Sequence, residues 1–384
     1  MNNIHIYPSN LIFESRIFRI AEVLSRNPII ERVTLVGFLD RNQQHKEKLA
    51  DKVEINRLYC IFSPQSTNKT LKILFLLEFS IRIFFFVLFR KDVVLNCHSI
   101  SLLPISTLLK FITRCLLIYD THELETKTHS SRGIQGFIFK ASENFCIGHC
   151  DYVFTVNSEI AAWYYDEYSM KTMPFVVRNF SDIGEIQSKY IGNVRDKLGL
   201  TQEDIVLLYI GVLSVGRGIE LILNNQNLFP KKFKFLFVGY GTLQNSIKIA
   251  CSASNQVFFL PAVTRDEILS LVKQCDIGLS LIENISLSYY LSLPNKFSEY
   301  IVGGIPVLAS RFPVMQQLTD TKGVGWTMEP SATALASFLE SFNTQDYLEK
   351  KKRCEIEKDF FSWKSESKVL KRAYESILSP NKIV

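Results

Sequence analysis

The 384-residue chain has little charge, since charged residues make up only 21% of it while 47% are hydrophobic. This composition excludes an intrinsically disordered protein and a collagen-like fibre. Its 44 Lys and Arg against 38 Asp and Glu leave a net charge of +6. That surplus is too small for a dedicated nucleic-acid-binding protein, so we expect no nucleic-acid partner and only local contact with anions.

The chain also lacks any regular cysteine pattern. Its eight cysteines are scattered through apolar stretches without a repeated spacing, which excludes a small disulfide-stabilised module and indicates reduced thiols in the cytoplasm. Cys146, His149 and Cys150 are the nearest approach to a metal motif, but no second pair completes it, so we predict no metal site. The N-terminus does not have the pattern of a secretory signal, which again favours a cytoplasmic protein.

A convincing membrane-spanning segment is missing as well. The most apolar stretch is Lys69–Lys91, yet Glu78 and Arg82 stand near its middle, where a spanning helix would tolerate them poorly. Two readings remain open: a helix packed within the fold, or a helix lying on a membrane surface. Residues 69–114 contain seven cations and two anions, so this region predicts peripheral contact with an anionic membrane.

Short β-rich apolar runs alternate with helical stretches along the whole chain, which is typical of βαβ units and parallel sheets. We predict two doubly wound α/β domains, residues 1–180 and 181–360, with the junction near Phe180–Ile205. The predicted strands are Ile4–Tyr7, Val33–Phe38, Val93–Cys97, Cys115–Tyr119, Tyr152–Val156, Phe175–Val177, Ile205–Ile210, Phe233–Val238, Val257–Leu260, Ile277–Leu281 and Pro306–Ala309.

Candidate ligand-binding residues follow several of these strands, because doubly wound folds bind ligands at the carboxyl ends of their strands. A loop from Gly211 to Gly218 brings Arg217 to the start of a helix, an arrangement suited to phosphate. A later helix begins at Pro294, Asn295 and Lys296 and contains Glu299. The Glu299 carboxylate could accept hydrogen bonds from a ribose diol while the helix N–H groups meet a diphosphate.

Three further places belong to this set. Val238–Gly241 reads as a close-approach turn, because the third glycine of a dinucleotide motif is missing. The main chain at Pro261, directly after a strand, could hydrogen-bond a planar base. In the first domain His122 follows Asp120 at a strand end, which suits a sugar-hydroxyl contact, a proton-handling group or a structural cap, and His98 ends the neighbouring strand.

Taken together, these motifs resemble the glycosyltransferase group 1 family, glycosyltransferase family 4, over nearly the whole chain. The residues that carry the resemblance are Glu14-Ser-Arg16, Tyr119–Leu124, Val177-Arg-Asn179, Gly211…Arg217-Gly218, Val238–Gly241 and Pro294–Val307. The resemblance implies the GT-B architecture of two facing Rossmann-like domains. It also implies that residues 361–384, with Phe361, Trp363 and Tyr374, form a closing helix that returns to the first domain.

The resemblance further implies retaining transfer of a hexose from a nucleotide diphosphate sugar to an acceptor hydroxyl, with no cofactor beyond that donor and no required metal. Glu299 would hold the ribose, Arg217 the diphosphate, and the backbone of Pro294–Lys296 the phosphates, while His122 would face the donor sugar. The nucleotide site would thus comprise Gly211, Gly218, Gly241, Pro261, Pro294, Asn295, Lys296 and Glu299. The implied acceptor is a lipid-linked saccharide in surface polysaccharide synthesis, such as lipopolysaccharide or capsule, on the cytoplasmic face of a membrane.

The chain departs from the family at two positions. Leu291 stands where many members have a glutamate, and Val212 where many have an arginine. Two alternatives stay open: a sugar-nucleotide epimerase of the same architecture and, because of these departures, a catalytically silent GT-B partner subunit. The sequence identifies neither the sugar nor the nucleotide.

Overall fold

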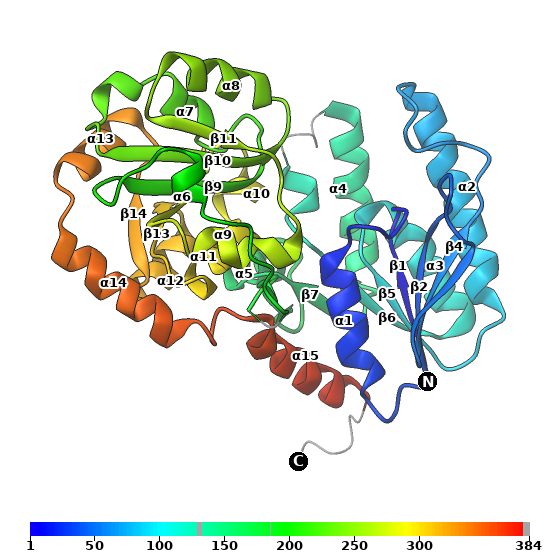
Figure 1. Cartoon of the computed structure of the whole chain (residues 1–384). Helices are drawn as coiled ribbons and strands as arrows, with labels where there is room; N and C mark the ends of the chain where they lie inside the picture. The colour runs from blue at the N-terminus through cyan, green and yellow to red at the C-terminus, as the bar shows by residue number, and fades with distance from the viewer. Residues whose placement is uncertain (129–132, 185, 379–384) are drawn as a thin grey trace. The chain divides into compact units, whose positions relative to one another are not determined.

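The computed structural model describes residues 1–128, 133–184 and 186–378 of the chain. The chain divides into two compact units (Figure 1). Unit 1 comprises Met1–Arg178 together with the chain from Ser367 onward, and unit 2 comprises Asn179–Glu366. Both units are α/β, as the alternating apolar runs predict.

In the described residues, unit 1 contains an eight-stranded sheet in the order β3-β4-β2-β1-β5-β6-β7-β8. All neighbouring strands are parallel except β3 and β4. The strands are β1 (Asn2–Ile6), β2 (Arg32–Phe38), β3 (Lys46–Ala50), β4 (Val53–Leu58), β5 (Val93–Cys97), β6 (Leu116–Asp120), β7 (Tyr152–Thr155) and β8 (Phe175–Val176). The strand order reverses at β1, so its carboxyl end lies at the topological switch point, where ligands bind in such folds.

The helices of unit 1 are α1 (Ser15–Ser25), α2 (Lys69–Leu88), α3 (Leu103–Thr113), α4 (Gly133–Ile147) and α5 (Ser158–Glu167), with one-turn helices at Ile100–Leu102 and Glu125–Lys127. Helices α2, α3 and α4 pack in a row. The last helix, α15 (Trp363–Leu378), ends in unit 1, where the Tyr374 hydroxyl donates to Asn96 Oδ1 at 2.5 Å. No helix in the described residues is long and apolar enough to cross a membrane.

Unit 2 contains a six-stranded parallel sheet in the order β11-β10-β9-β12-β13-β14 within the described residues. The strands are β9 (Ile205–Val212), β10 (Phe233–Tyr240), β11 (Val257–Leu260), β12 (Ile277–Ser280), β13 (Val307–Ser310) and β14 (Gly325–Met328). The helices are α6 (Val194–Lys197), α7 (Ile219–Leu223), α8 (Gln244–Ala253), α9 (Ile268–Val272), α10 (Leu287–Tyr290), α11 (Asn295–Val302), α12 (Pro313–Lys322), α13 (Ala332–Glu340) and α14 (Thr344–Glu357), with one-turn helices at Gln226–Leu228 and Arg265–Glu267.

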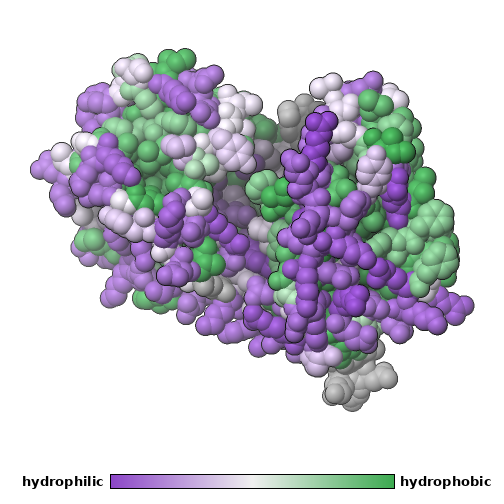
Figure 2. Space-filling model, turned by 45° about the vertical axis from the view of Figure 1, so that its right-hand side comes forward, coloured by the Kyte–Doolittle hydropathy of each residue, from purple (hydrophilic) through white to green (hydrophobic). Residues whose placement is uncertain are grey.

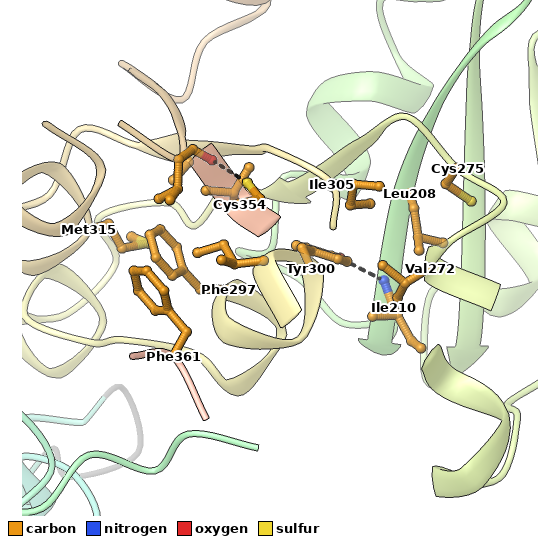
Figure 3. Close-up of a cluster of buried hydrophobic side chains, with 14 of the residues drawn as sticks. Leu208, Ile210, Val272, Cys275, Phe297, Tyr300, Ile305, Met315, Cys354 and Phe361 are labelled. Carbon is orange, nitrogen blue, oxygen red and sulfur yellow. Dashed lines mark hydrogen bonds between the residues drawn. The ribbon is translucent and has the colours of Figure 1, made fainter. Parts of the chain in front are cut away.

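One buried cluster of unit 2 fixes the end of the sheet where the candidate ligand residues lie (Figure 3). Strands β9 and β12 pair only at Ile277 with Leu207 and Gly278 with Leu208, after which they separate. The buried Tyr300 hydroxyl of α11 bridges the gap, because it accepts from Ile210 N–H at 3.1 Å and donates to the Leu279 carbonyl at 3.2 Å. Helix α11 is therefore anchored directly to the carboxyl end of β9.

Each predicted strand is present to within two residues at either end, but three strands were not predicted. They are β3, β4 and β14. The edge strand β3 has the polar sequence Lys-Glu-Lys-Leu-Ala and is mostly exposed, so it lacks the apolar run that marks a buried parallel strand. The predicted domain limits at 180 and 360 fall close to the unit limits at 178 and 366.

Candidate functional site

A pocket of about 500 Å³ lies at the carboxyl ends of β9, β10 and β11 and beside the start of α11. We call it the unit 2 pocket. It is lined by Ile210, Gly211, Val212, Val238, Gly239, Tyr240, Ala262, Val263, Ile268, Asn295, Lys296 and Glu299. Four of the predicted site residues, Gly211, Asn295, Lys296 and Glu299, are therefore brought together in one cavity.

The start of α11 forms one wall of this pocket. Pro294 is its N-cap residue, with extended backbone, and Gly303 ends it, as the sequence predicts. The first N–H groups of a helix have no acceptor within the helix, and they carry partial positive charge. Glu299 lies one turn further along, so the pocket has N–H donors and a carboxylate on the same helix.

Gly218 and Gly241 do not line the unit 2 pocket. Their role is close backbone approach: a Cβ at Gly218 would lie 2.5 Å from the Leu281 carbonyl oxygen, and one at Gly241 would lie 2.3 Å from that of Leu213. Both have positive φ, +74° and +151° respectively. The structure therefore gives these two predicted binding glycines a role in shaping the loops around the pocket.

Pro261 is exposed at the end of β11 and is not itself part of the pocket lining, whereas Ala262 and Val263, the next residues along the chain, are. Val212 contributes a half-exposed aliphatic side chain to the lining. Leu291 is buried at the end of α10. Positions 291 and 212, where many members of the family have a glutamate and an arginine, are thus occupied by uncharged aliphatic side chains.

Two cations near the pocket rest on tyrosine rings. Lys296 Nζ lies 3.4 Å from the centroid of the Tyr209 ring, and the Arg217 guanidinium lies 4.6 Å from that of Tyr289. Burial lowers the pKa of Lys296 well below its ordinary value, and Arg217 lowers it further, against a smaller opposing effect of Glu299. The N–H groups at the start of α11 and the nearby Arg217 therefore favour an anion in this pocket.

A second cavity of about 340 Å³ lies in unit 1, at the carboxyl ends of β5 and β6. We call it the unit 1 pocket. Its lining includes Tyr7, His98, His122 and Glu125, and the His122 ring stacks on Tyr7 with a centroid distance of 5.5 Å. His122 is thus held in a different cavity from Glu299, and Arg217 lines neither of the two pockets.

Behind His122 lies a buried network of charged and polar groups. Arg16 binds both carboxylate oxygens of Asp120, at 3.2 and 2.7 Å, and His98 Nδ1 lies 3.2 Å from Asp120 Oδ2. Because a carboxylate accepts hydrogen bonds, His98 carries its proton on Nδ1. Its Nε2 then accepts from His5 Nδ1 at 2.8 Å.

The network sets the ionisation of two of its members. Burial alone would raise the pKa of Asp120, but Arg16 and His98 outweigh that effect and hold it well below its ordinary value. Burial lowers the pKa of His122 to about 3, opposed by Asp120 and assisted by His98 and Arg16. At neutral pH His122 is therefore uncharged, which favours a hydrogen bond to a sugar hydroxyl over proton transfer.

Glu125 lines the same pocket. Its carboxyl group accepts a hydrogen bond from Ile100 N–H at 2.7 Å. Burial raises the pKa of Glu125 to about 8, the Ile100 bond opposes the rise, and Glu143 adds to it. This group is consequently protonated at neutral pH and can donate a hydrogen bond into the cavity.

His98, Asp120 and His122 also bring three potential metal-ligand atoms within 4.8 Å of one another, the one such group in the described part of the chain. Both oxygens of Asp120 are already bound to Arg16. A metal ion there would lie beside a buried guanidinium, which disfavours it. The prediction that no metal is required stays a prediction.

Sequence reasoning missed the roles of Tyr209, Tyr289, Tyr300, His5 and Glu125. Tyr209 and Tyr300 lie in apolar runs, where an aromatic residue is usually part of the core. His5 and Glu125 have no partner nearby in the sequence that would mark them. His5 lies in β1 and Glu125 follows β6, and this position relative to a strand was the signal that the sequence offered for these two residues.

The fold of the chain is similar to the folds of several solved structures. Sucrose-phosphate synthase from Thermosynechococcus elongatus matches 99% of this chain and 100% of its own, with a TM-score of 0.76 and 14% identity. Anabaena HepE in complex with UDP matches 98% and 100%, with a TM-score of 0.71 and 16% identity. A glycosyltransferase from Rickettsia africae matches 98% of both chains, with a TM-score of 0.68 and 13% identity.

The fold and the pocket at its strand ends thus define an α/β protein of the GT-B architecture. Residues 191–358 match the family of glycosyl transferases group 1, and none of the curated proteins matches the chain. This stretch of unit 2 is therefore similar to the glycosyl transferases group 1 family, and the chain as a whole has the GT-B fold. The resemblance predicted from its motifs is confirmed.

Proposed function

We propose that the protein is a retaining, metal-independent glycosyltransferase that moves a hexose from a nucleoside diphosphate sugar to an acceptor hydroxyl. The observation that carries this proposal is the unit 2 pocket, which combines the Glu299 carboxylate, the N-terminus of α11 and a buried lysine. A nucleoside diphosphate needs these same groups: an acceptor for ribose hydroxyls and donors for phosphate oxygens.

The chemistry follows from the charges. Cleavage of the bond between the anomeric carbon and the donor phosphate leaves negative charge on the diphosphate. Fixed N–H groups and cations at that position lower the barrier, because they need no reorganisation as the charge develops. The neutral His122 contacts a sugar hydroxyl. The HepE structures in complex with UDP and with UDP-glucose support the choice of donor class.

Thermal denaturation with and without UDP, GDP, ADP and their sugar conjugates tests the donor site. A ligand at about 100 times its dissociation constant adds about 2.7 kcal/mol to folded-state stability. We expect one nucleotide to raise the melting temperature of the wild type and of Glu340→Ala, an exposed control in unit 2, but not of Glu299→Ala. If no nucleotide stabilises the wild type, the proposal fails and a catalytically silent subunit is favoured.

A second experiment separates transfer from epimerisation. A transferase releases free nucleoside diphosphate as the sugar reaches an acceptor, whereas an epimerase returns the sugar still attached. We expect nucleoside diphosphate release that depends on added acceptor. Interconversion of two nucleotide sugars without release would identify the epimerase alternative.

For the acceptor we propose a lipid-linked saccharide met at the cytoplasmic face of a membrane, with unit 1 touching the lipid. Helix α2 has two opposite apolar stripes. Phe75, Phe79, Ile83 and Val87 are buried, and Ile73, Leu77, Ile81 and Phe85 are 55–60% exposed. Each residue of the second stripe is more than half exposed. Thus the packed-helix reading describes one face of α2, and the membrane-surface reading is proposed for the other.

The neighbouring helices continue this apolar surface (Figure 2). On α3, Leu108, Phe111 and Ile112 are 46–59% exposed. Exposed cations lie near the ends of α2 and α3 at Lys69, Lys72, Lys91 and Arg114, while Glu78 is neutralised by Arg82 at 2.7 Å. An apolar centre with a basic rim is complementary to an anionic lipid surface.

Vesicle co-sedimentation tests this contact. We expect the wild type to bind vesicles containing anionic phospholipid, and Phe85→Glu to reduce binding at unchanged melting temperature, since Phe85 is 60% exposed. Ile249→Glu, at an apolar position in unit 2 that is 71% exposed, is the matched control and should bind as the wild type does. Equal binding by both variants would contradict the contact.

A further inference from the structure

The hydrogen bonds of His98 determine which ring nitrogen of His122 carries a proton. His98 is 1% exposed, and its Nδ1 lies 3.2 Å from Asp120 Oδ2 and 3.1 Å from His122 Nε2. The ionised Asp120 can only accept a hydrogen bond, so the proton of His98 lies on Nδ1. This one N–H group therefore faces both Asp120 and His122.

The same proton fixes the tautomer of His122. If His122 Nε2 also carried a proton, two N–H groups would point at each other across 3.1 Å. His122 Nε2 is therefore the acceptor, and in the neutral ring the proton lies on Nδ1. A second proton on His98 Nε2 would not change this result, because His98 Nδ1 would still be the donor.

The orientation of His98 is itself fixed from both sides. Its Nε2 accepts from His5 Nδ1 at 2.8 Å. On the other side Arg16 holds Asp120 with two hydrogen bonds and makes a third, at 2.8 Å, to the Val177 carbonyl. The four side chains of this network are at most 3% exposed. Close packing on all sides leaves the imidazole of His98 a single orientation.

The other nitrogen of His122 opens into the unit 1 pocket. Within the described residues Nδ1 has no hydrogen-bond partner, and it is not a buried atom. The ring lines the cavity and stacks on Tyr7. His122 thus offers a ligand one N–H group and no free nitrogen lone pair.

We propose that His98 is a positioning residue that holds His122 in the tautomer with its proton on Nδ1, so that His122 binds the sugar only as a hydrogen-bond donor. The sugar atom that it contacts is therefore an acceptor. For the same reason His122 takes no proton from the attacking hydroxyl, since its ring has no lone pair free to receive one. The inference rests on the proposed function for the identity of the ligand, whereas the tautomer is a property of the protein alone.

Nuclear magnetic resonance of the full chain, with nitrogen-15 in its histidine rings, tests the tautomer. The spectra are recorded at pH 8, where a free imidazole is neutral. We expect His122, identified by the signals that His122→Asn removes, to have a protonated Nδ1 and an unprotonated Nε2. The exposed His45 of the same unit is the internal control. It should show the usual preference of histidine for a proton on Nε2.

Two substitutions of His98 separate a positioning role from a structural one. His98→Asn keeps a side-chain N–H donor near the place of Nδ1 and should preserve the tautomer of His122. His98→Leu removes the donor, so the proton of His122 should move to Nε2. If His98→Leu does not fold, the spectra of the wild type and of His98→Asn decide the question.

Isothermal titration calorimetry measures the consequence for the sugar. The probes are UDP and UDP-glucose, replaced by GDP and GDP-mannose or ADP and ADP-glucose if UDP does not bind. His98→Leu should weaken binding of the sugar conjugate about threefold to tenfold and leave the affinity for the free diphosphate unchanged. His98→Asn should recover most of that loss. His45→Asn, which alters an exposed histidine, should match the wild type.

Three results would overturn the inference while leaving the proposed function intact. The first is a protonated Nε2 on His122 in the wild type. The second is an unchanged tautomer of His122 in folded His98→Leu, since another group would then fix it. The third is equal weakening of sugar-conjugate binding by His98→Asn and His98→Leu, which would give His98 only a structural role. If the wild type binds none of the three diphosphates, the proposed function fails instead, and the spectra still decide the tautomer.

Discussion

The two pockets of this protein manage charge in opposite ways. Behind the unit 1 pocket, Arg16 and Asp120 form a buried ion pair and His98 completes it, so the charges are satisfied by one another. In unit 2, Lys296 in the pocket and Arg217 near it rest on tyrosine rings, and neither has an ion-pair partner among the described residues. The charges behind the unit 1 pocket are therefore paired with one another, whereas the basic side chains of the unit 2 site contact aromatic rings instead of carboxylates.

This difference predicts what each pocket recognises. A cavity whose charges are already paired presents neutral donors and acceptors, which suits the hydroxyl groups of a sugar. A cavity beside basic side chains that have no ion-pair partner gains most from a ligand that carries negative charge, which suits a diphosphate. The assignment of sugar contacts to unit 1 and of the diphosphate to unit 2 therefore has a physical basis separate from family resemblance.

The largest expected effect comes from breaking the paired network of unit 1. Arg16→Met leaves Asp120 buried without its guanidinium, and we expect a loss of about 3–5 kcal/mol in the free energy of unfolding, measured by urea denaturation. Because the folded pKa of Asp120 is lowered, this stabilisation is present above the ordinary Asp value of about 4 and is lost as pH falls through the lowered folded value.

The matched control for that variant is Arg26→Met, which removes an exposed partner of Glu22 at the C-terminal cap of the same helix. Its cost should be below about 1 kcal/mol. A similar loss in the free energy of unfolding for the two variants would show that the Arg16 pair does not stabilise unit 1. The proposed contrast between the two pockets would then not hold for unit 1.

A smaller and pH-dependent effect is expected at Glu125. The folded pKa of this carboxyl group is raised to about 8, so folding of the wild type requires a proton at neutral pH. Glu125→Gln removes that requirement while keeping an oxygen acceptor for Ile100 N–H. The variant should be more stable than the wild type by about 2–4 kcal/mol at pH 8, with the advantage vanishing as pH falls towards 4.5.

Melting curves of the wild type and variant from pH 4.5 to pH 8.5 check this expectation. Glu123→Gln, which alters an exposed carboxyl group two residues earlier, is the control. A pH-independent difference between Glu125→Gln and the wild type would mean that Glu125 is ionised in the fold. The unit 1 pocket would then contain a charged carboxylate.

Much of the fold was predictable because buried parallel strands are continuous apolar runs, and because Pro294 and Gly303 mark the ends of α11. Strand β3 was not, since a polar edge strand lacks that signal. The pocket-lining residues of α11 were predictable from their place after a strand. The supporting roles of Tyr209 and Tyr289 were not, because their function depends on which cation the fold brings over the ring.

The smallest expected effect tests whether an aromatic ring in unit 2 does what a carboxylate does in unit 1. Tyr289→Leu removes the ring beneath Arg217, and UDP affinity measured by calorimetry should fall about two- to fivefold, the range for a partly exposed cation–π contact. Tyr290→Leu is the control, because that neighbouring ring lies against Phe312 at a centroid distance of 5.0 Å. Equal affinities in both variants would mean that the ring does not position Arg217. A gain in affinity for Tyr289→Leu would mean that the ring competes with the diphosphate for Arg217. The ring would then hold the guanidinium only while the ligand is absent, and would not position it for ligand binding.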